Sequence, residues 1–345
     1  MTDATASRRV DRLFALYPAL ALATLLPVGA ITPLFPVELG VAVFALGTLT
    51  VGMAHGAVDH LVPVRAADVS LTRSVSAVAV VYAVLGGAVV TAFFLAPVTA
   101  FVGFIALTWL HWGQGDVAAL VVVGVDHLPT TAERALALFV RGGLPMGVPL
   151  LAHPAEYRLV AEWVVGLFVV DPAAATAAVD PVFTGNVRVA VGVAMASATL
   201  LAAALGAARV RRGADRRGWH RDVGEIAVLW AWFLLAAPVF AVGVYFAVWH
   251  ALRHVGRLVL VDEAAAGAIA AGDRHRALRR FARDAAPLTL GGFAVIGIVA
   301  RAVPSGVATS GDLLAASLVA IAALTLPHVA VVAWLDAQQG VWRSA

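Results

Sequence analysis

Five of the ten histidines in the chain lie inside long apolar segments: His55, His111, His250, His254 and His328. An ionisable side chain is costly within a bilayer, so residues of this kind mark candidate functional sites. Neutral imidazole binds Fe(II), Zn(II), Cu(II) and Ni(II). The five histidines therefore indicate transition-metal chemistry, and the ligand type alone does not decide which metal is bound.

His250 and His254 form a pair at helical spacing. Four residues of separation place both imidazoles on one face of a helix, with Cβ atoms about 5 to 6 Å apart. From that distance two nitrogens can reach one metal ion. With His55 and His111 from two other helices they would make a set of four neutral nitrogen donors, and we predict metal binding by these four. For His55 or His111 alone, the alternative is a hydrogen bond to a neighbouring helix.

Two acids follow the histidine motifs closely. Asp59 is four residues after His55, and Asp116 is five residues after His111. Either carboxylate could accept an imidazole N–H and fix its tautomer, or could pair with Arg253. The alternative for both acids is a charge at a helix end that faces the lipid headgroups.

His328 leaves three interpretations open: a further ligand, a residue that orients a ligand, or a contact between helices. His60 is turned away from His55 by its spacing, and we assign it no role. The remaining histidines fall in predicted loops and also receive no role: His127, His153, His220 and His275. Aromatic residues beside the motifs could line a channel for a long apolar substrate, although belt or core packing explains each one singly.

The composition requires a membrane around these elements. Of 345 residues, 61% are hydrophobic and only 13% are charged, which is too little polar material to coat a globule of this size. The chain has no cysteine, so disulfides, thiolate metal sites and iron–sulfur clusters are excluded. The net charge is +3, and the arginines gather in loops rather than in a stripe, which argues against nucleic-acid binding.

The predicted fold is an all-α, polytopic transmembrane helical bundle of about ten helices (eight to ten) in a single domain, 1–345. The predicted spans are 13–31, 37–58, 74–95, 98–121, 135–151, 187–208, 223–238, 240–261, 287–303 and 312–335. The apolar stretch 157–170 is short for a span, and we predict an interfacial or re-entrant position for it. The stretch 262–284 reads as a short amphipathic cytoplasmic helix.

Arginine-rich short loops stay on the cytoplasmic side of the membrane. With ten spans, the loops around Arg65, Arg134, Arg212 and Arg279 all fall on that side. This predicts a multi-pass protein of the cell membrane with cytoplasmic amino and carboxyl termini. The second, fourth, eighth and tenth helices would then run from outside to inside, so that their histidines share one depth.

In these residues the chain resembles the bacteriorhodopsin-related protein family, the membrane β-carotene 15,15′-dioxygenases that supply retinal to microbial rhodopsins. The resemblance covers nearly the whole chain, and its short motifs occur in order. They are His55-Gly56 with Asp59-His60, His111-Trp112, Trp249-His250 with Arg253-His254, and Pro327-His328.

The resemblance implies a function. The family's iron ligands would fall on His55, His111, His250 and His254, with Fe(2+) as cofactor and β-carotene and O₂ as substrates. The reaction would split the central double bond of β-carotene into two molecules of all-trans-retinal, with hand-over of retinal to a rhodopsin as an implied partnership. Asp59, Asp116, Arg253 and His328 would lie around the ligands. An apolar substrate would reach such a site laterally from the membrane lipid.

Two other classes remain open at this point. Membrane lipid hydroxylases and desaturases hold two metal ions with several HxxxH and HxxHH boxes, whereas this chain has one HxxxH and no HxxHH. A transporter or channel would use buried His, Asp and Arg side chains as a proton or ion path. No internal repeat of the kind common in transporters is visible in the sequence.

Overall fold

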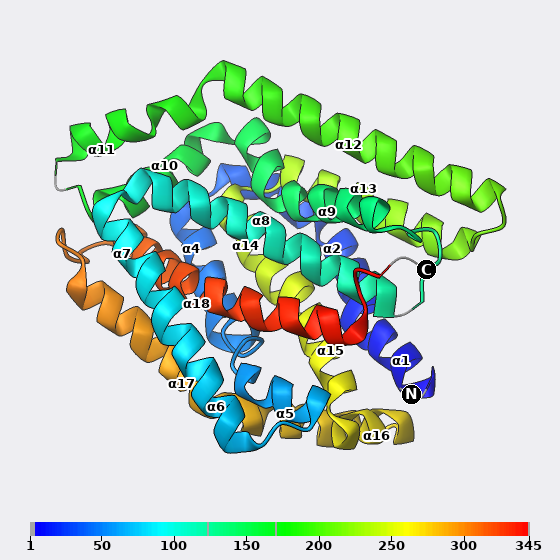
Figure 1. The fold of residues 1–345 in the computed structure, drawn as a ribbon. Helices are drawn as coiled ribbons and strands as arrows, with labels where there is room; N and C mark the ends of the chain where they lie inside the picture. Colours follow the sequence, from blue (N-terminus) through cyan, green and yellow to red (C-terminus); the bar gives the residue numbers. More distant parts are fainter. Residues whose placement is uncertain (1–3, 123, 170, 344–345) are drawn as a thin grey trace.

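The computed structural model describes residues 4–122, 124–169 and 171–343, and the regular elements within these ranges are all helices (Figure 1). The predicted all-α fold is therefore confirmed. The extreme ends of the predicted 1–345 domain, and Val170 at the end of the short apolar stretch, lie outside the described residues.

The helices have the following bounds. The first half of the chain forms α1 (Ala4–Asp11), α2 (Tyr17–Thr24), α3 (Leu26–Ile31), α4 (Val37–Gly47), α5 (Val62–Ala67), α6 (Leu71–Val81), α7 (Gly87–Leu95), α8 (Pro97–Val122) and α9 (Thr131–Ala152). The second half forms α10 (Pro154–Gly166), α11 (Pro172–Val179), α12 (Gly185–Arg211), α13 (Arg216–Leu235), α14 (Pro238–Val244), α15 (Leu252–Val261), α16 (Glu263–Ala271), α17 (Arg274–Ala302) and α18 (Ser310–Gln339).

Several of these helices are joined by turns of a different width. Wider, π-type turns occupy Arg12–Leu16, Thr48–Gly52, Tyr82–Gly86 and Tyr245–Ala251, and tighter 3₁₀ turns occupy Thr32–Leu34, Asp59–Leu61 and Asp180–Phe183. As a result α6 and α7 form one continuous helix, Leu71–Leu95, and α14 and α15 form another, Pro238–Val261.

Six helices in the described part of the chain are long and apolar enough to cross a bilayer: Leu71–Leu95, Thr131–Ala152, Gly185–Arg211, Pro238–Val261, Arg274–Ala302 and Ser310–Gln339. A seventh is the pair Ala4–Thr24 and Leu26–Leu34, bent by 44°, if the two parts are one span. Each predicted span overlaps a helix, but the number of helices of bilayer length is below the predicted ten. The helix Val37–Gly52 is short, and α8 and α13 carry polar residues such as Asp116 and Glu225 that lower their mean hydropathy.

The predicted span 37–58 ends early, at Gly52. Beyond it, residues 53–58 form turns, so His55 lies in a turn and not in a helix. The ring nitrogen Nδ1 of His55 hydrogen-bonds the carbonyl oxygen of Gly52. The imidazole thus occupies an oxygen that a backbone N–H of the next helical turn would otherwise reach, and the helix stops there.

Two further predicted stretches, 262–284 and 157–170, can be compared with the helices of the structure. The stretch 262–284 is not one amphipathic helix. α16 ends at Ala271, the next residue Gly272 has a left-handed φ of 90°, and α17 begins at Arg274 and continues to Ala302. A glycine adopts that backbone conformation without strain. In the stretch 157–170, α10 covers Pro154–Gly166, and its 13 residues extend only about 20 Å, which is too short for a span.

The arginine-rich segments that predict the topology are linked by ion pairs and hydrogen bonds. Arg221, near the start of α13, pairs with Asp11 at the end of α1 over 2.7 Å. Arg65 of α5 pairs with Asp262, the residue before α16, over 2.9 Å. Arg9 of α1 donates to the carbonyl oxygen of Ile269 in α16.

The other arginine-rich segments join the carboxyl-terminal part of the chain. Arg209 of α12 pairs with Glu133 of α9 over 2.8 Å. Arg134, the next residue of α9, donates to the carbonyl oxygens of Val341 and Arg343. These segments and both ends of the described chain therefore lie on one side of the bundle, as the predicted topology requires.

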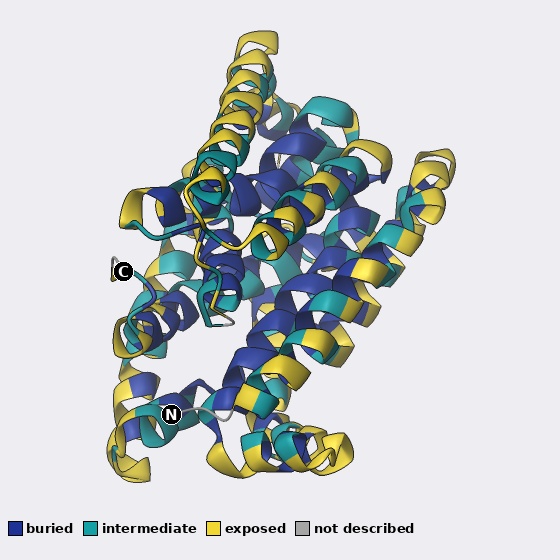
Figure 2. Ribbon diagram, turned by 90° about the vertical axis from the view of Figure 1, so that its right-hand side faces the viewer, coloured by how far each residue is buried: buried dark blue, intermediate teal, exposed yellow. Residues whose placement is uncertain are grey.

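The helices that carry the histidines occupy the interior of the bundle. In Figure 1, α12 runs along one edge and α6, α7 and α17 along another, with α4, α14, α15 and α18 between them. The sides of the outer helices that face away from the bundle are exposed, and the inner sides are buried (Figure 2). α8 and α9 approach closely at Gly142, where a Cβ atom would lie 1.9 Å from the carbonyl oxygen of Trp109.

Candidate metal centre

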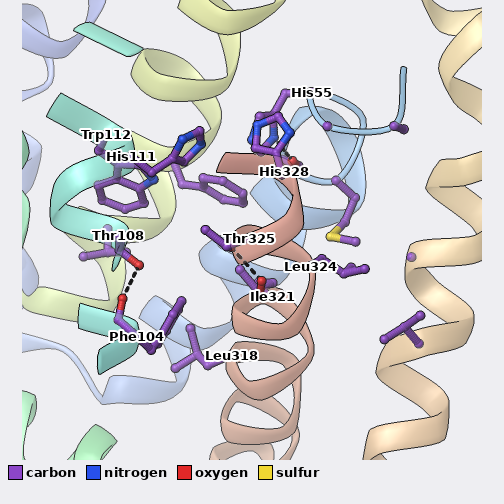
Figure 3. Close-up of a pocket in the computed structure, with 18 of the residues that line it drawn as sticks. His55, Phe104, Thr108, His111, Trp112, Leu318, Ile321, Leu324, Thr325 and His328 are labelled. Carbon is purple, nitrogen blue, oxygen red and sulfur yellow. Dashed lines mark hydrogen bonds between the residues drawn. The ribbon is translucent and has the colours of Figure 1, made fainter. Parts of the chain in front are cut away.

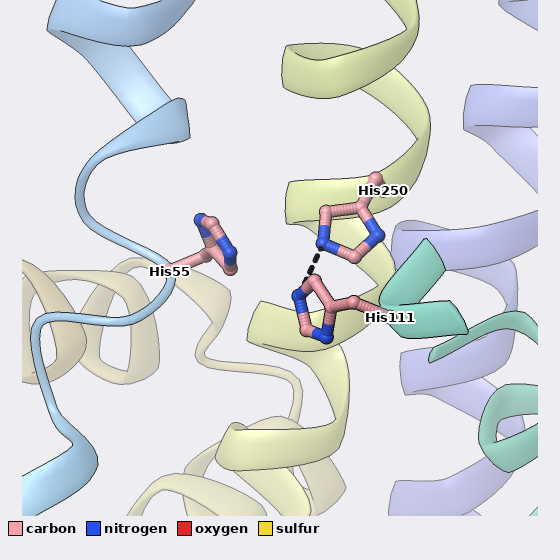
Figure 4. A group of neighbouring side chains, drawn as sticks. All are labelled: His55, His111 and His250. Atoms are coloured by element: carbon pink, nitrogen blue, oxygen red, sulfur yellow. Dashed lines mark hydrogen bonds between the residues drawn. The ribbon is translucent and has the colours of Figure 1, made fainter. Parts of the chain in front are cut away.

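Three histidines bring their ring nitrogens together inside the bundle (Figure 4). The Nε2 atoms of His111 and His250 are 3.1 Å apart, and the ring centroid of His55 lies 5.2 Å from that of His250. One nitrogen from each of the three rings lies within 4.8 Å of the other two. Because a metal–nitrogen bond is about 2.0 to 2.1 Å, two nitrogens on one ion lie at most about 4 Å apart. Small movements of the rings would therefore let the three share one ion.

A second group of donors adjoins the first. It consists of His254, His328 and Asp59, whose ligand atoms also lie within 4.8 Å of one another. The ring centroids of His254 and His328 are 5.0 Å apart, and that of His328 is 5.1 Å from His55. The four predicted ligands and His328 thus form one group of five rings, which we call the histidine cluster. His60 lies beside this cluster but belongs to neither group of ligand atoms.

The elements around the cluster depart locally from regular α-helix. His250 lies in the wide turn Tyr245–Ala251, and His254 follows in α15. Such π-type turns are frequent at functional sites because they redirect side chains. Here His250 joins the group with His111, while His254 joins the group with His328. The pair that spacing predicts on one helix face therefore serves the two halves of the cluster.

His328 is positioned by the proline before it. Pro327 lies inside α18 and has no N–H, so the carbonyl oxygen of Ala323 loses its usual helical partner. Gly86, in the turn between α6 and α7, packs against this oxygen, and a Cβ atom there would lie 2.9 Å from it. The close approach of the two helices at this point holds the histidine-bearing part of α18 in place.

Several nitrogens of the cluster have no hydrogen-bond partner among the described residues. They are Nδ1 of His111, both ring nitrogens of His254, and Nε2 of His328, and all are buried. A buried polar atom without a partner is costly, so such atoms need an explanation. A metal ion that accepts one lone pair from each ring would explain one of these nitrogens in each histidine. The donor set, neutral imidazoles with a nearby carboxylate, fits a divalent transition metal such as iron.

Asp59 supports the cluster through His328. Its Oδ2 atom lies 2.8 Å from Nδ1 of His328 and accepts a hydrogen bond of 2.7 Å from the hydroxyl of Tyr82. If Nδ1 of His328 carries the proton, its Nε2 is left with a lone pair for the cluster. The sequence predicts that Asp59 could accept an imidazole N–H, and the structure gives His328, not His55, as the partner. Tyr82 is not foreseen from the sequence.

Asp116 is buried and does not bond His111. Its carboxylate accepts hydrogen bonds from Arg141 at 2.8 Å and from the indole of Trp249 at 3.0 Å, and it pairs with Arg253 at 3.5 Å. Arg253 also pairs with Glu225 at 3.0 Å and lies over the Trp249 ring. Of the alternatives predicted for Asp116, the structure therefore shows the ion pair with Arg253. Asp116 thereby ties α8 to α15 through Arg253, and to the turn that carries His250 through Trp249.

Arg141 is the largest residue of the site that sequence reasoning missed. Its side chain is fully buried and pairs with Asp116, with Asp222 at 2.7 Å and with Glu225 at 2.8 Å. Asp222 in turn lies 2.9 Å from Nε2 of His127. Arg141 is an ionisable residue within a predicted span, so the rule that singled out the histidines would have found it too.

A cavity of about 510 Å³ opens onto the histidine cluster. His55, His111 and His328 line it, and the rest of its wall is mostly apolar. Figure 3 shows α8 and α18 facing each other across the space, with Phe104 and Leu318 farther from the histidines. Along α18 the lining runs from His328 back to Leu314, about 21 Å at 1.5 Å per residue. The cavity is therefore elongated and mostly apolar, and its polar lining comes from the histidines, from Asp59 and Tyr82 beside them, and from a few hydroxyl groups such as those of Thr108 and Thr325.

Comparisons with known proteins decide the family. The family model described as "Beta-carotene 15,15'-dioxygenase" matches residues 46–336, which contain the whole histidine cluster. The chain belongs to the β-carotene 15,15′-dioxygenase family. The resemblance seen in the short motifs is thereby confirmed.

Two curated members of the β-carotene 15,15′-dioxygenase family, both from Halobacterium salinarum, match over most of their length. The chain is 45% identical over 292 residues to the "Probable beta-carotene 15,15'-dioxygenase Blh" of strain NRC-1, covering 84% of this chain and 82% of that protein. It is 30% identical over 320 residues to the "Probable beta-carotene 15,15'-dioxygenase Brp" of strain R1, covering 89% and 86%. No solved structure matches the fold.

Proposed function

We propose that this protein cleaves the central double bond of β-carotene with O₂, at a mononuclear Fe(2+) site held by His55, His111, His250 and His254. Each carbon of the broken bond receives one oxygen atom of O₂, so that two molecules of all-trans-retinal form and no other reductant is needed. The observation that carries this proposal is the convergence of the histidine cluster on a long apolar cavity, in a chain of the β-carotene 15,15′-dioxygenase family.

The cavity supports a long apolar substrate. Ligand sites are typically about 300 to 1,000 Å³, largely apolar, with few polar groups that fix the orientation. In this cavity the histidines are prominent among those groups, and the aromatic rings of Trp112 and Phe246 lie beside them, 5.5 and 6.2 Å from the ring of His250 between centroids. A polyene that lies along α8 and α18 would pass the histidines, which line the same cavity.

The protein's own residues would bind, orient and exclude water. Neutral imidazoles would hold the ion without cancelling its charge, and iron bound there would supply the activation of O₂. Asp59 holds His328 at the edge of the cluster, and His328 could add a further nitrogen to the set. Asp116 and Arg253 would keep α8 and the turn with His250 in register.

The same wall argues against an ion path. A proton or ion route needs a chain of polar groups through the protein, whereas this cavity is lined mostly by apolar side chains away from the histidines. We propose a location in the cell membrane with both termini cytoplasmic, so that β-carotene and membrane lipid are neighbours in the same layer. Retinal released there could pass directly to a rhodopsin.

The test uses purified protein in lipid vesicles that contain β-carotene. We expect retinal to form at two molecules per β-carotene consumed, to stop when a chelator removes the metal, and to resume with Fe(II) but not with Zn(II), which has no redox chemistry. Absence of retinal from iron-loaded, folded protein would overturn the proposed activity. Aldehydes of other lengths would overturn the cleavage position.

A further inference from the structure

The cavity reaches the outer surface between α6 and α17. Four residues line it and are also exposed on the outside of the protein: Val75 and Ala79 on α6, and Leu288 and Gly291 on α17. The exposed fractions are 42% for Val75 and 46% for Leu288. A residue that borders an internal cavity and the outer surface at once marks an opening. These four residues therefore frame a mouth, which we call the α6–α17 opening.

This opening faces the membrane. Leu71–Leu95, which contains α6, and Arg274–Ala302, which is α17, are both among the helices of bilayer length, and only 17% of the most apolar window of each is buried within the protein. The rest of each window is exposed and mostly apolar. Such a surface is stable in the hydrocarbon core of a bilayer. All four framing residues are apolar as well, so nothing at the opening favours water or an ion.

From the opening, the way to the histidines passes Met53. Met53 lies in the turn two residues before His55 and lines the cavity. A Cβ atom on Gly292 would come within 2.3 Å of its methyl carbon, so the glycine makes room for this side chain. In Figure 3, Leu324 of α18 points into the same space, toward α17. Methionine is flexible and adapts its shape, which suits a passage that a bulky molecule must use.

Beyond the histidines the cavity continues to a second arm. Phe101 and Phe104 of α8 and Tyr157 and Val160 of α10 line that part. Phe101 is ten residues before His111, or about 15 Å along the helix. We call the part of the cavity at the α6–α17 opening the outer arm and the part under α10 the inner arm. In Figure 3, α18 with His328 stands between α8 and α17, so a long molecule that fills both arms would pass the histidines.

We infer that the α6–α17 opening is a lateral portal through which a long apolar polyene passes between the bilayer and the histidine cluster. This inference rests on the proposed function for the identity of the polyene. It adds the route, and a physical reason for central cleavage: one half of the molecule occupies the inner arm while the other half still occupies the portal arm.

Gly291 offers a clean test, because a Cβ atom there would meet nothing within 4 Å. Gly291→Phe should therefore fold normally, while its ring narrows the portal. Gly297 is a matched control on the same helix, since it is also exposed and open around its Cβ position but does not line the cavity. The added ring should hinder entry of the polyene, and we expect retinal formation to fall by about tenfold in Gly291→Phe, which corresponds to about 1.4 kcal/mol. Gly297→Phe should match wild type, and both should retain wild-type iron content.

The portal can also be blocked reversibly with a thiol reagent, because the chain contains no cysteine of its own. In Gly291→Cys the new thiol is unique, and a bulky thiosulfonate reagent should block retinal formation until a reductant removes it. The same treatment of Gly297→Cys should have no effect. Full labelling at position 291 with an unchanged rate would overturn the portal.

A second measurement separates the portal from the proposed function. β-Carotene that is bound to the purified protein after exposure to loaded vesicles can be read from its absorbance, without any turnover. If wild type forms no retinal but Gly291→Phe still lowers bound β-carotene relative to Gly297→Phe, the portal stands and the cleavage activity falls. If wild type forms retinal and both variants match it in binding and rate, the portal falls and the activity stands.

Discussion

His328 and Asp59 are joined across 269 positions of sequence by a contact of 2.8 Å between Nδ1 and Oδ2. The contact connects the last long helix with the short 3₁₀ turn that follows His55. Tyr82, at the end of α6, donates a hydrogen bond to the same carboxylate oxygen. Three segments therefore meet at Asp59: the end of α6, the 3₁₀ turn that contains Asp59, and α18. The acid thereby orients one ring of the histidine cluster from outside it.

Replacing this acid should weaken the site without abolishing it. Residues that orient metal ligands typically account for about 10- to 100-fold in metal affinity or activity. We therefore expect Asp59→Asn to lower iron affinity and retinal formation within that range, because an amide orients His328 less firmly than a carboxylate. Tyr82→Phe removes one hydrogen bond to the acid and should have a smaller effect. Wild-type behaviour of Asp59→Asn, or complete inactivity, would contradict this role.

Loss of Arg141 should mainly destabilise the fold. Removing one partner from a buried ion cluster leaves unpaired charge and costs about 3–5 kcal/mol. Arg141→Met would leave Asp116, Asp222 and Glu225 with fewer partners, and we expect a clear fall in the thermal unfolding temperature of the detergent-solubilised protein. The control is Arg158→Met, because its ion pairs with Glu162 and Asp180 are open to solvent and should contribute little to stability. Equal effects of the two changes would refute a structural role for the cluster.

The histidine cluster should hold close to one iron per chain. A ligating imidazole must be neutral, so bound iron should be lost progressively as the pH falls below about 6.5, the ordinary pKa of histidine. Metal analysis of protein equilibrated at a series of pH values measures both quantities. Folded, reconstituted protein that holds no iron, or two irons per chain, would be incompatible with a mononuclear site.

The arginine loops should all be cytoplasmic. Reporter fusions near Arg212 and near Arg279 should both report the cytoplasm, because short arginine-rich loops stay on that side. The ion pair between Arg221 and Asp11 places the start of α13, which follows the first of these loops, beside the amino-terminal helix α1. Reports from opposite sides of the membrane would mean that one predicted span is wrong.

The convergence of the histidines could be predicted from the sequence, because its physical basis is local. An ionisable residue in an apolar span must face the inside of the bundle, and the pair His250 and His254 shares a helix at fixed spacing. The orientation of the spans, inferred from arginine, placed the other histidines at a similar depth. The structure brings all of these rings into one cluster.

Other features depend on contacts between distant residues, which spacing does not encode. The turn at His55 arises because the imidazole ring hydrogen-bonds the carbonyl oxygen of Gly52. The apolar pattern of the sequence does not show this bond, so it predicts a helix that continues to residue 58. The partner of Asp59 is His328, far along the chain, rather than the nearby His55. The portal depends on which faces of α6 and α17 remain uncovered, and only the packed bundle decides that.

The most direct test of the metal centre is the amount of retinal in cells that make β-carotene, normalised to the amount of this protein in the membrane. His254→Ala removes one of the four proposed iron ligands and should abolish retinal while the protein remains in the membrane, and His250→Ala should do the same. His60 lines the cavity but lies outside both groups of ligand atoms, so His60→Ala should keep its iron and stay close to wild type. Retinal at the wild-type level in His250→Ala and His254→Ala would contradict the assignment of the histidine cluster as the catalytic iron site.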